Sequence, residues 1–142
     1  MKTQFFLAIV AATLAFAQRD ENTSAASAQS EANKHHATAD AICGEANTQM
    51  DINQCLTAAY QTADKELNEL YSNIMKKQDP ADRDHLQAAQ RAWIEYRDAN
   101  CEAAAARYQG GSIQPSIRAE CLRRNTRARA DELRQVYDTG SR

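Results

Sequence analysis

The sequence lacks the short motifs that mark common enzyme and metal sites. It has no glycine-rich phosphate loop, no nucleophile elbow and no His-Glu-x-x-His zinc motif. None of its four cysteines belongs to a Cys-x-x-Cys pair, which argues against a thioredoxin-like redox site or a zinc ribbon. General acid or base chemistry also needs a concave site, and a small helical domain offers little concavity. We therefore expect no catalytic residue, no metal site and no cofactor.

The chain also lacks an excess of basic charge. It has 17 basic and 19 acidic side chains, a balance that does not suggest nucleic-acid binding. The charges are unevenly placed, because residues 39–75 contain six acids and one lysine, whereas residues 117–134 contain six arginines and three acids. Two helices of opposite charge could lie side by side. Two solvated faces, with little attraction once salt screens them, are the simpler explanation.

No apolar run is long enough to cross a membrane comfortably. The run from Phe5 to Ala17 follows one lysine and ends in Ala15-Phe16-Ala17, as signal peptides do before their cleavage site. We expect residues 1–17 to be a secretory signal peptide that is cleaved after Ala17. No cysteine follows that site, so we expect no lipid anchor and no membrane anchor. The mature protein should be soluble in the bacterial periplasm or secreted.

The segment after the signal peptide has no large apolar side chain from Gln18 to Thr38. Such a composition cannot bury enough surface to fold. We expect a flexible polar leader over residues 18–40, with the pair His35-His36 in solvent because no third metal ligand is apparent nearby. The folded domain should then cover residues 41–138, and residues 139–142 should form a disordered tail.

The domain should begin with two helices. From Asp51 to about Lys77, apolar residues recur at three- and four-residue steps without proline or glycine, which predicts a long amphipathic helix. Asp79-Pro80 breaks this pattern, and one of the nearby aspartates could cap the next helix. A second helix is predicted from about Ala81 to Tyr108, and Gly110-Gly111-Ser112 should end it.

A third helix should run from Ile117 to about Tyr137, after a short loop from Ile113 to Ser116 around Pro115. The sequence therefore predicts an all-α fold, a small disulfide-stapled bundle of three main helices in which the first two form a long antiparallel hairpin. The spacing suggests an inward stripe on the second helix and one on the third: Leu86, Ala89, Trp93, Tyr96, Asn100 and Ala104, and Ile117, Cys121, Leu122, Ala130, Leu133 and Val136.

The four cysteines, Cys43, Cys55, Cys101 and Cys121, should form two disulfides, since an exported chain of this size with an even count is usually bridged. Each bridge would stabilise the fold by roughly 2–4 kcal/mol. An antiparallel hairpin places Cys55 level with Cys101, so we favour that pair and, by elimination, Cys43 with Cys121. The competing pattern joins Cys43 to Cys55 and Cys101 to Cys121, and the sequence alone does not decide between them.

The stretch from Gln87 to Cys101, QAAQRAWIEYRDANC, is rich in functional side chains. On a helix, Leu86, Gln90, Trp93, Arg97 and Cys101 share one face, and a bridged cysteine would turn that face inward. We expect Arg97 and Gln90 to form a structural polar network with a face of the first helix that carries Asp64, Asn68 and Tyr71. The functional alternative, in which Asp64 or Glu66 acts as a general acid or base beside Arg97, is disfavoured.

The order of these residues resembles that of the LprI-like lysozyme inhibitor domain of bacterial envelope proteins. The resemblance covers about Cys43 to Leu133, and its residues are Cys43, Cys55, Ala63-Asp64, Leu67-Asn68, Tyr71, Ala89 to Ile94, Tyr96-Arg97-Asp98, Cys101, Gly110-Gly111-Ser112, Cys121-Leu122, Thr126, Arg129 and Leu133. The pattern Gln-x-x-Trp-x-x-Tyr-Arg-Asp-x-x-Cys is its most specific part. The resemblance implies a disulfide-linked helical domain that is exported and inhibits lysozyme, without catalytic residues.

Two functions are the main candidates, and a peptidoglycan-associated protein is a third, weaker possibility. In the first, the chain binds a lysozyme-type muramidase and blocks it. The acidic residues Asp51, Glu66 and Glu69 would then steer the partner, and the loop Gly110-Gly111-Ser112 would enter its cleft. In the second, the chain is a periplasmic interaction, immunity or structural module whose protein partner is not a lysozyme.

Overall fold

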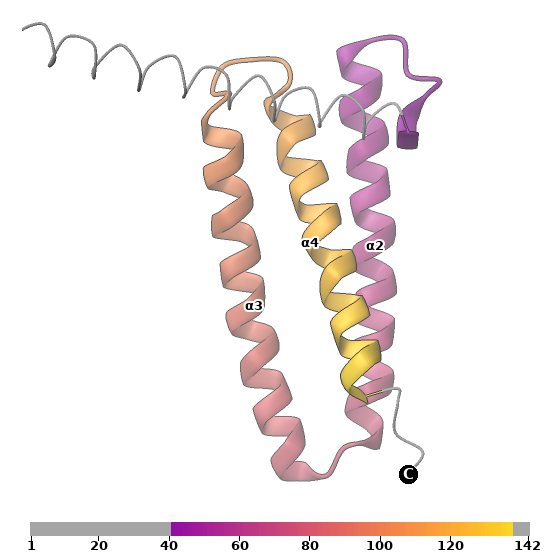
Figure 1. Cartoon of the computed structure of the whole chain (residues 1–142), viewed down its shortest axis with the longest axis vertical. Helices are drawn as coiled ribbons and strands as arrows, with labels where there is room; N and C mark the ends of the chain where they lie inside the picture. Colours follow the sequence, from indigo (N-terminus) through magenta and orange to yellow (C-terminus); the bar gives the residue numbers. More distant parts are fainter. Residues whose placement is uncertain (1–40, 138–142) are drawn as a thin grey trace, which may run out of the picture. The chain divides into compact units, whose positions relative to one another are not determined.

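The computed structural model describes residues 41–137, and three long helices dominate this part of the chain. They are α2 (Gln49–Lys77), α3 (Pro80–Ala106) and α4 (Gln114–Tyr137), and no strand occurs among the described residues (Figure 1). The predicted all-α bundle of three main helices is therefore confirmed. The predicted signal peptide, the leader with His35-His36 and the tail 139–142 lie outside the described residues.

Local sequence signals set the helix ends. Thr48 caps α2 by accepting a hydrogen bond from the backbone of Asp51, whose carboxylate accepts one from Thr48 N in return. Asp79 caps α3 by accepting from Asp82 N at 2.9 Å, and Pro80 takes the first helical position, where no backbone donor is needed. The prediction of a loop from Ile113 to Ser116 was wrong, because α4 begins at Gln114 and Pro115 lies in its first turn.

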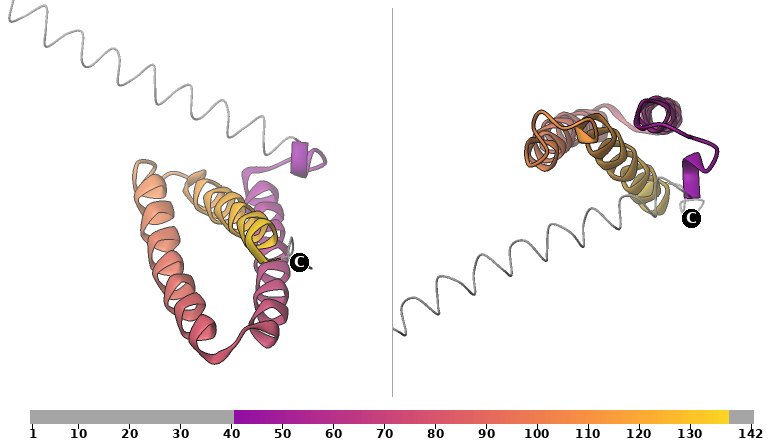
Figure 2. Two further views of the ribbon diagram at one scale, coloured as in Figure 1. Left: turned by 60° about the horizontal axis from the view of Figure 1, so that its bottom comes forward. Right: turned by 90° about the horizontal axis from the view of Figure 1, so that it is seen from above.

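The third helix joins the first two into a bundle. A short turn reverses the chain between α2 and α3, so that these helices run in opposite directions. Figure 2 shows the two arms separating away from this turn, with α4 packed against both of them. The closest packing is between α2 and α4, and the next is between α3 and α4. The acidic helix α2 and the arginine-rich helix α4 therefore lie side by side.

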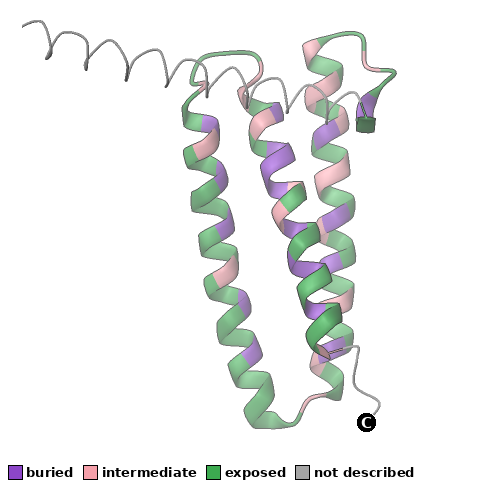
Figure 3. Ribbon diagram, in the orientation of Figure 1, coloured by how far each residue is buried: buried purple, intermediate pink, exposed green. Residues whose placement is uncertain are grey.

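The core consists of three small apolar clusters along the bundle. Nearest the turn, Leu67 and Ile74 of α2 pack with Leu86 of α3 and with Ala130 and Leu133 of α4. The other two clusters lie toward the opposite end; they comprise Cys101, Cys121 and Leu122, and Cys43, Leu56 and Ala119. Figure 3 shows the buried residues of each helix on the sides that face its neighbours.

Four residues expected in the core are on the surface, namely Ala89, Tyr96, Asn100 and Val136. Tyr96 and Val136 are each 61% exposed, so the inward stripe that contained Tyr96 was wrong in this position. The alternative face, with Leu86, Gln90, Arg97 and Cys101, is buried. Trp93 is only half-buried and packs against the cluster near the turn. Within residues 41–137, no helix combines the length and the apolarity that a membrane span requires.

All four cysteines are bridged, but the favoured pairing was wrong. Cys43 is bonded to Cys55 and Cys101 to Cys121, across sequence separations of 12 and 20 residues. The prediction placed Cys55 and Cys101 against each other because it treated α2 and α3 as direct neighbours along their whole length. Instead, α4 lies against both helices and brings Cys121 to Cys101, while the segment before α2 brings Cys43 to Cys55.

Candidate functional site

The most elaborate arrangement of polar side chains in the described region is centred on Arg97. This residue comes from the buried face of α3, and it is only 7% exposed. Its guanidinium donates to Asp64 Oδ1 on α2 at 3.1 Å, to Asp98 Oδ1 at 2.9 Å and to Thr126 Oγ1 on α4 at 3.3 Å. One side chain thus connects all three helices of the bundle.

A second arginine, Arg129 of α4, lies beside the first. Its Nε donates to Gln90 Oε1 at 3.1 Å and its Nη1 donates to Glu132 Oε2 at 2.8 Å. The ring of Trp93 lies near both guanidinium carbons, 5.0 Å from that of Arg97 and 6.0 Å from that of Arg129. Trp93 therefore offers its aromatic face to two buried cations, which stabilises both of them.

The pKa values of two groups reflect this environment. Burial lowers the pKa of Arg97, but its hydrogen bond to Asp98 and the field of Tyr60 outweigh that effect, so its pKa lies above the ordinary value. Burial raises the pKa of Tyr60 above 10.0, although nearby Arg97 acts in the opposite direction. The Arg97 guanidinium lies 5.7 Å from the centre of the Tyr60 ring. The arginine is therefore always charged and the phenol stays neutral at physiological pH.

The remaining residues of the predicted network take different positions. Asn68 Nδ2 donates to Asp64 Oδ2 at 3.0 Å, so it orients the carboxylate that Arg97 uses. Gln90 does not join Asn68 as expected, because it accepts from Arg129. Tyr71 is half-buried against the apolar cluster nearest the turn. Sequence reasoning left Thr126 and Arg129 out of the network, although their spacing with Leu133 places all three on one face of α4.

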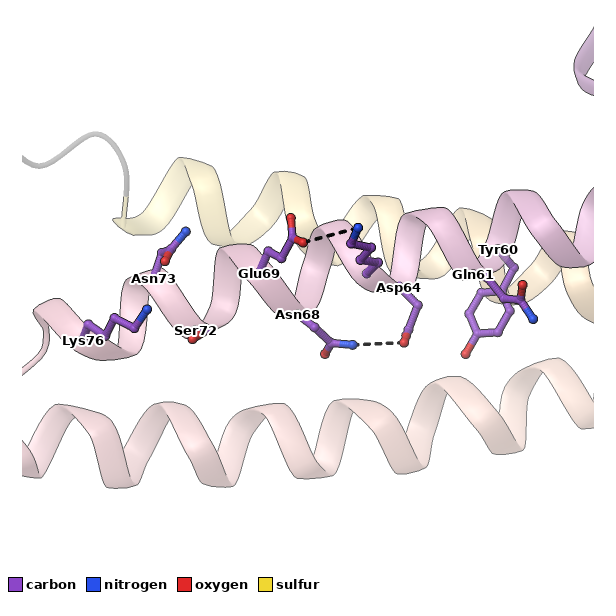
Figure 4. Close-up of a pocket in the computed structure, with 9 residues that line it drawn as sticks. Tyr60, Gln61, Asp64, Asn68, Glu69, Ser72, Asn73 and Lys76 are labelled. Atoms are coloured by element: carbon purple, nitrogen blue, oxygen red, sulfur yellow. Dashed lines mark hydrogen bonds and ion pairs between the residues drawn. The ribbon is translucent and has the colours of Figure 1, made fainter.

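An open groove of about 680 Å³ runs along α2 beside this network. Its lining belongs to α2 and is polar: Tyr60, Gln61, Asp64, Lys65, Asn68, Glu69, Ser72, Asn73 and Lys76. Figure 4 shows Tyr60, Asp64 and Asn68 pointing from α2 toward α3. The exposed side chains of Lys65 and Glu69 form an ion pair at 3.9 Å. Residues 41–137 contain no group of three or more histidine, cysteine or acidic side chains that could hold a metal ion.

The Gly110-Gly111-Ser112 loop lies at the end of the bundle away from the α2–α3 turn. Gly110 has φ +79°, a left-handed conformation that favours glycine, and all three loop residues are exposed. The loop is held in place, because Asn53 Nδ2 of α2 donates to Ser112 O at 3.1 Å. Asn53 also bonds the hydroxyl of Ser116, to which Gln49 donates at 2.8 Å. The loop is thus a fixed surface feature.

The three acidic candidates on α2 differ in how free they are. Asp51 uses its carboxylate in the cap of its own helix, where it accepts from Thr48 N at 3.0 Å. Glu69 pairs with Lys65 on the surface. Glu66 is exposed, and among residues 41–137 it has no hydrogen-bond or ion-pair partner. The structure therefore does not bring these acids together with the loop into one site, since Glu66 and Glu69 lie about four helical turns beyond Asn53, which holds the loop.

Comparison with known proteins gives a consistent result. A family model described as lysozyme inhibitor LprI matches residues 39–133, which include nearly all the described helices. The chain is also 36% identical over 110 residues to an uncharacterized protein, R02472, of Rhizobium meliloti (strain 1021), and the match covers 68% of this chain and 79% of that protein. No solved structure matches the chain.

Proposed function

The chain belongs to the LprI family of lysozyme inhibitors, and we propose that it is an exported bacterial protein that binds a lysozyme-type muramidase and blocks it. The observation that carries this proposal is the extent of the family match, which spans the described domain from the first cysteine to the last turn of α4. We expect the protein in the periplasm or secreted, with its signal peptide removed.

The geometry of the polar network supports inhibition by binding. The polar groups of the network are engaged with one another: Asp64 is held by Arg97 and Asn68, and Arg129 is held by Gln90 and Glu132. These contacts fix the three helices to each other, so their role is to hold the scaffold. An activity built on this scaffold belongs to its outer surface.

The properties of the partner match features of that surface. Lysozyme-type muramidases are often basic and keep two carboxylates in their cleft. Glu66 and Glu69 on the exposed side of α2 would speed the encounter with a basic partner by electrostatic steering. The fixed Gly110-Gly111-Ser112 loop would meet the cleft without a large loss of conformational freedom.

An inhibition assay tests this proposal. The mature protein, oxidised so that both bridges are present, is titrated against a c-type lysozyme, a g-type lysozyme and a bacterial muramidase while hydrolysis of cell walls is followed. We expect tight inhibition of at least one of these enzymes and an association rate that falls as salt is added. No binding to any of them at micromolar protein would refute the proposal and favour a non-lysozyme partner, which a pull-down from envelope extract would then identify.

A further inference from the structure

Besides its buried face, helix α3 has an exposed face without charged residues. Its buried residues, among them Leu86, Arg97 and Cys101, face α4 and α2 (Figure 3). On the exposed surface of the helix, spacings of three and four residues align six side chains, which we call the Tyr96 face: Ala88, Ala89, Ala92, Tyr96, Ala99 and Ala103. No described part of the chain covers this face.

The Tyr96 face has the composition of a contact surface. Tyr96 is a large aromatic side chain that is 61% exposed near the middle of a regular helix. Tyrosine is enriched among the residues that contribute most to protein interfaces. The alanines beside it have small side chains, so the backbone of a partner can approach closely. None of the six residues of the face is charged, although a quarter of all residues in the chain are.

One edge of the Tyr96 face is acidic. Asp84, Glu95, Asp98 and Glu102 follow each other at helical spacing along this edge, with Arg91 as the only basic residue among them. Asp98 and Glu102 are partly neutralised by Arg97 and Arg118. Asp84 and Glu95 have no ion-pair partner among residues 41–137, and neither does Arg91, so the unpaired charge along this edge is two acids and one base.

The exposed side of α4 has the opposite character. Arg124 and Arg127 are exposed there and have no ion-pair partner in the described part of the chain. The bundle thus offers acidic charge beside the Tyr96 face and basic charge on α4. A basic protein would be attracted to the first and repelled by the second, so the charge distribution favours one orientation of a cationic partner.

We propose that the Tyr96 face of α3 is the surface that contacts a cationic muramidase, with Tyr96 as its anchor and Glu95 as a charged contact on its acidic edge. This inference rests on the proposed function, and it adds a contact surface on α3 to the candidates on α2 and in the glycine loop. Because Tyr96 is exposed, its replacement leaves the fold intact, so binding and stability can be measured separately.

The test compares four proteins in binding to a c-type lysozyme, a g-type lysozyme and a bacterial muramidase. They are the wild type, Tyr96→Ala, Glu95→Lys and the control Val136→Ala, which removes an equally exposed apolar side chain from α4. We expect Tyr96→Ala to raise the Kd at least about tenfold, Glu95→Lys to slow association at low salt, and Val136→Ala to bind like the wild type. Thermal unfolding should be the same in all four.

The outcomes separate this inference from the proposed function. Wild-type affinity in both α3 variants would overturn the assignment of the Tyr96 face and leave muramidase binding intact. A wild type that binds none of the three enzymes would overturn the proposed function, and with it the surface. An equal loss of affinity in the Val136→Ala control would also overturn the assignment, because it would show that any exposed apolar residue has the same effect.

Discussion

Replacing Arg97 by alanine should destabilise the domain more than removing any other single charged side chain. Arg97 is the point at which α2, α3 and α4 meet, through Asp64, Trp93 and Thr126. Its removal would free the two carboxylates that it binds and leave the fully buried hydroxyl of Thr126 without this donor.

The size of the stability loss in Arg97→Ala follows from how exposed each partner of Arg97 is. The Asp64 side chain is 35% exposed and that of Asp98 is 50% exposed, so water replaces part of what they lose and each ion pair contributes at most about 1 kcal/mol. The stranded hydroxyl of Thr126 costs about 1–3 kcal/mol, and the lost contact with Trp93 adds roughly 0.5–1 kcal/mol. We expect a total on the order of 3 kcal/mol.

Denaturant and thermal unfolding of the oxidised protein measure this effect. A loss of about 3 kcal/mol corresponds to a fall in Tm of roughly 12–24 °C for a domain of this size. Arg97→Lys keeps the charge but loses the planar guanidinium fork, so its stability should lie between that of Arg97→Ala and that of the wild type. The control is Arg127→Ala, which removes an exposed arginine of α4 and should change stability by less than about 0.5 kcal/mol. Equal stabilities of the Arg97→Ala and Arg127→Ala variants would show that the network does not hold the bundle.

Three further predictions follow from the structure. Because the folded-state pKa of Tyr60 is raised, its contribution to stability is complete below pH 10 and is lost as the pH rises through that pKa; Tyr60→Phe should therefore lose less stability between pH 9 and 11 than the wild type. Because Gly110 has a positive φ, Gly110→Ala should lower the free energy of unfolding by about 1 kcal/mol, as measured by denaturant unfolding. Gly110→Asn should lower it by less. Replacing Cys101 and Cys121 together by serine should cost about 3 kcal/mol on the chain-entropy estimate for their 20-residue separation, and an unchanged unfolding midpoint would contradict it.

The helices could be predicted closely from the sequence because their signals are local. Spacing of apolar residues, the cap at Asp79 and the glycines after α3 each act within one or two turns. The contact between Arg97 and Asp64 was also accessible, since both residues lie on faces that a short turn brings together. These features depend on neighbours along the chain or on a single reversal of its direction.

Features that depend on where α4 packs could not be predicted in the same way. The pairing of Cys101 with Cys121 and the contact of Arg129 with Gln90 both require α4 to lie against α3. Periodicity alone also did not distinguish the buried face of α3 from its exposed, alanine-rich face, and it placed Tyr96 on the buried one. A helix that is apolar on two sides has an ambiguous orientation, and only its packing against other helices resolves which side is buried.

Both disulfides lie at the end of the bundle that carries the loop we propose as a partner contact. Both bridges lie at the end that contains the start of α2, the end of α3 and the start of α4 (Figure 1). The Gly110-Gly111-Ser112 loop leaves the same end and is held there by Asn53. At the other end, the turn between α2 and α3 depends on apolar packing around Leu86 and Leu133. Covalent links therefore fix the end with the candidate loop, and a surface fixed before binding loses less conformational entropy when a partner arrives.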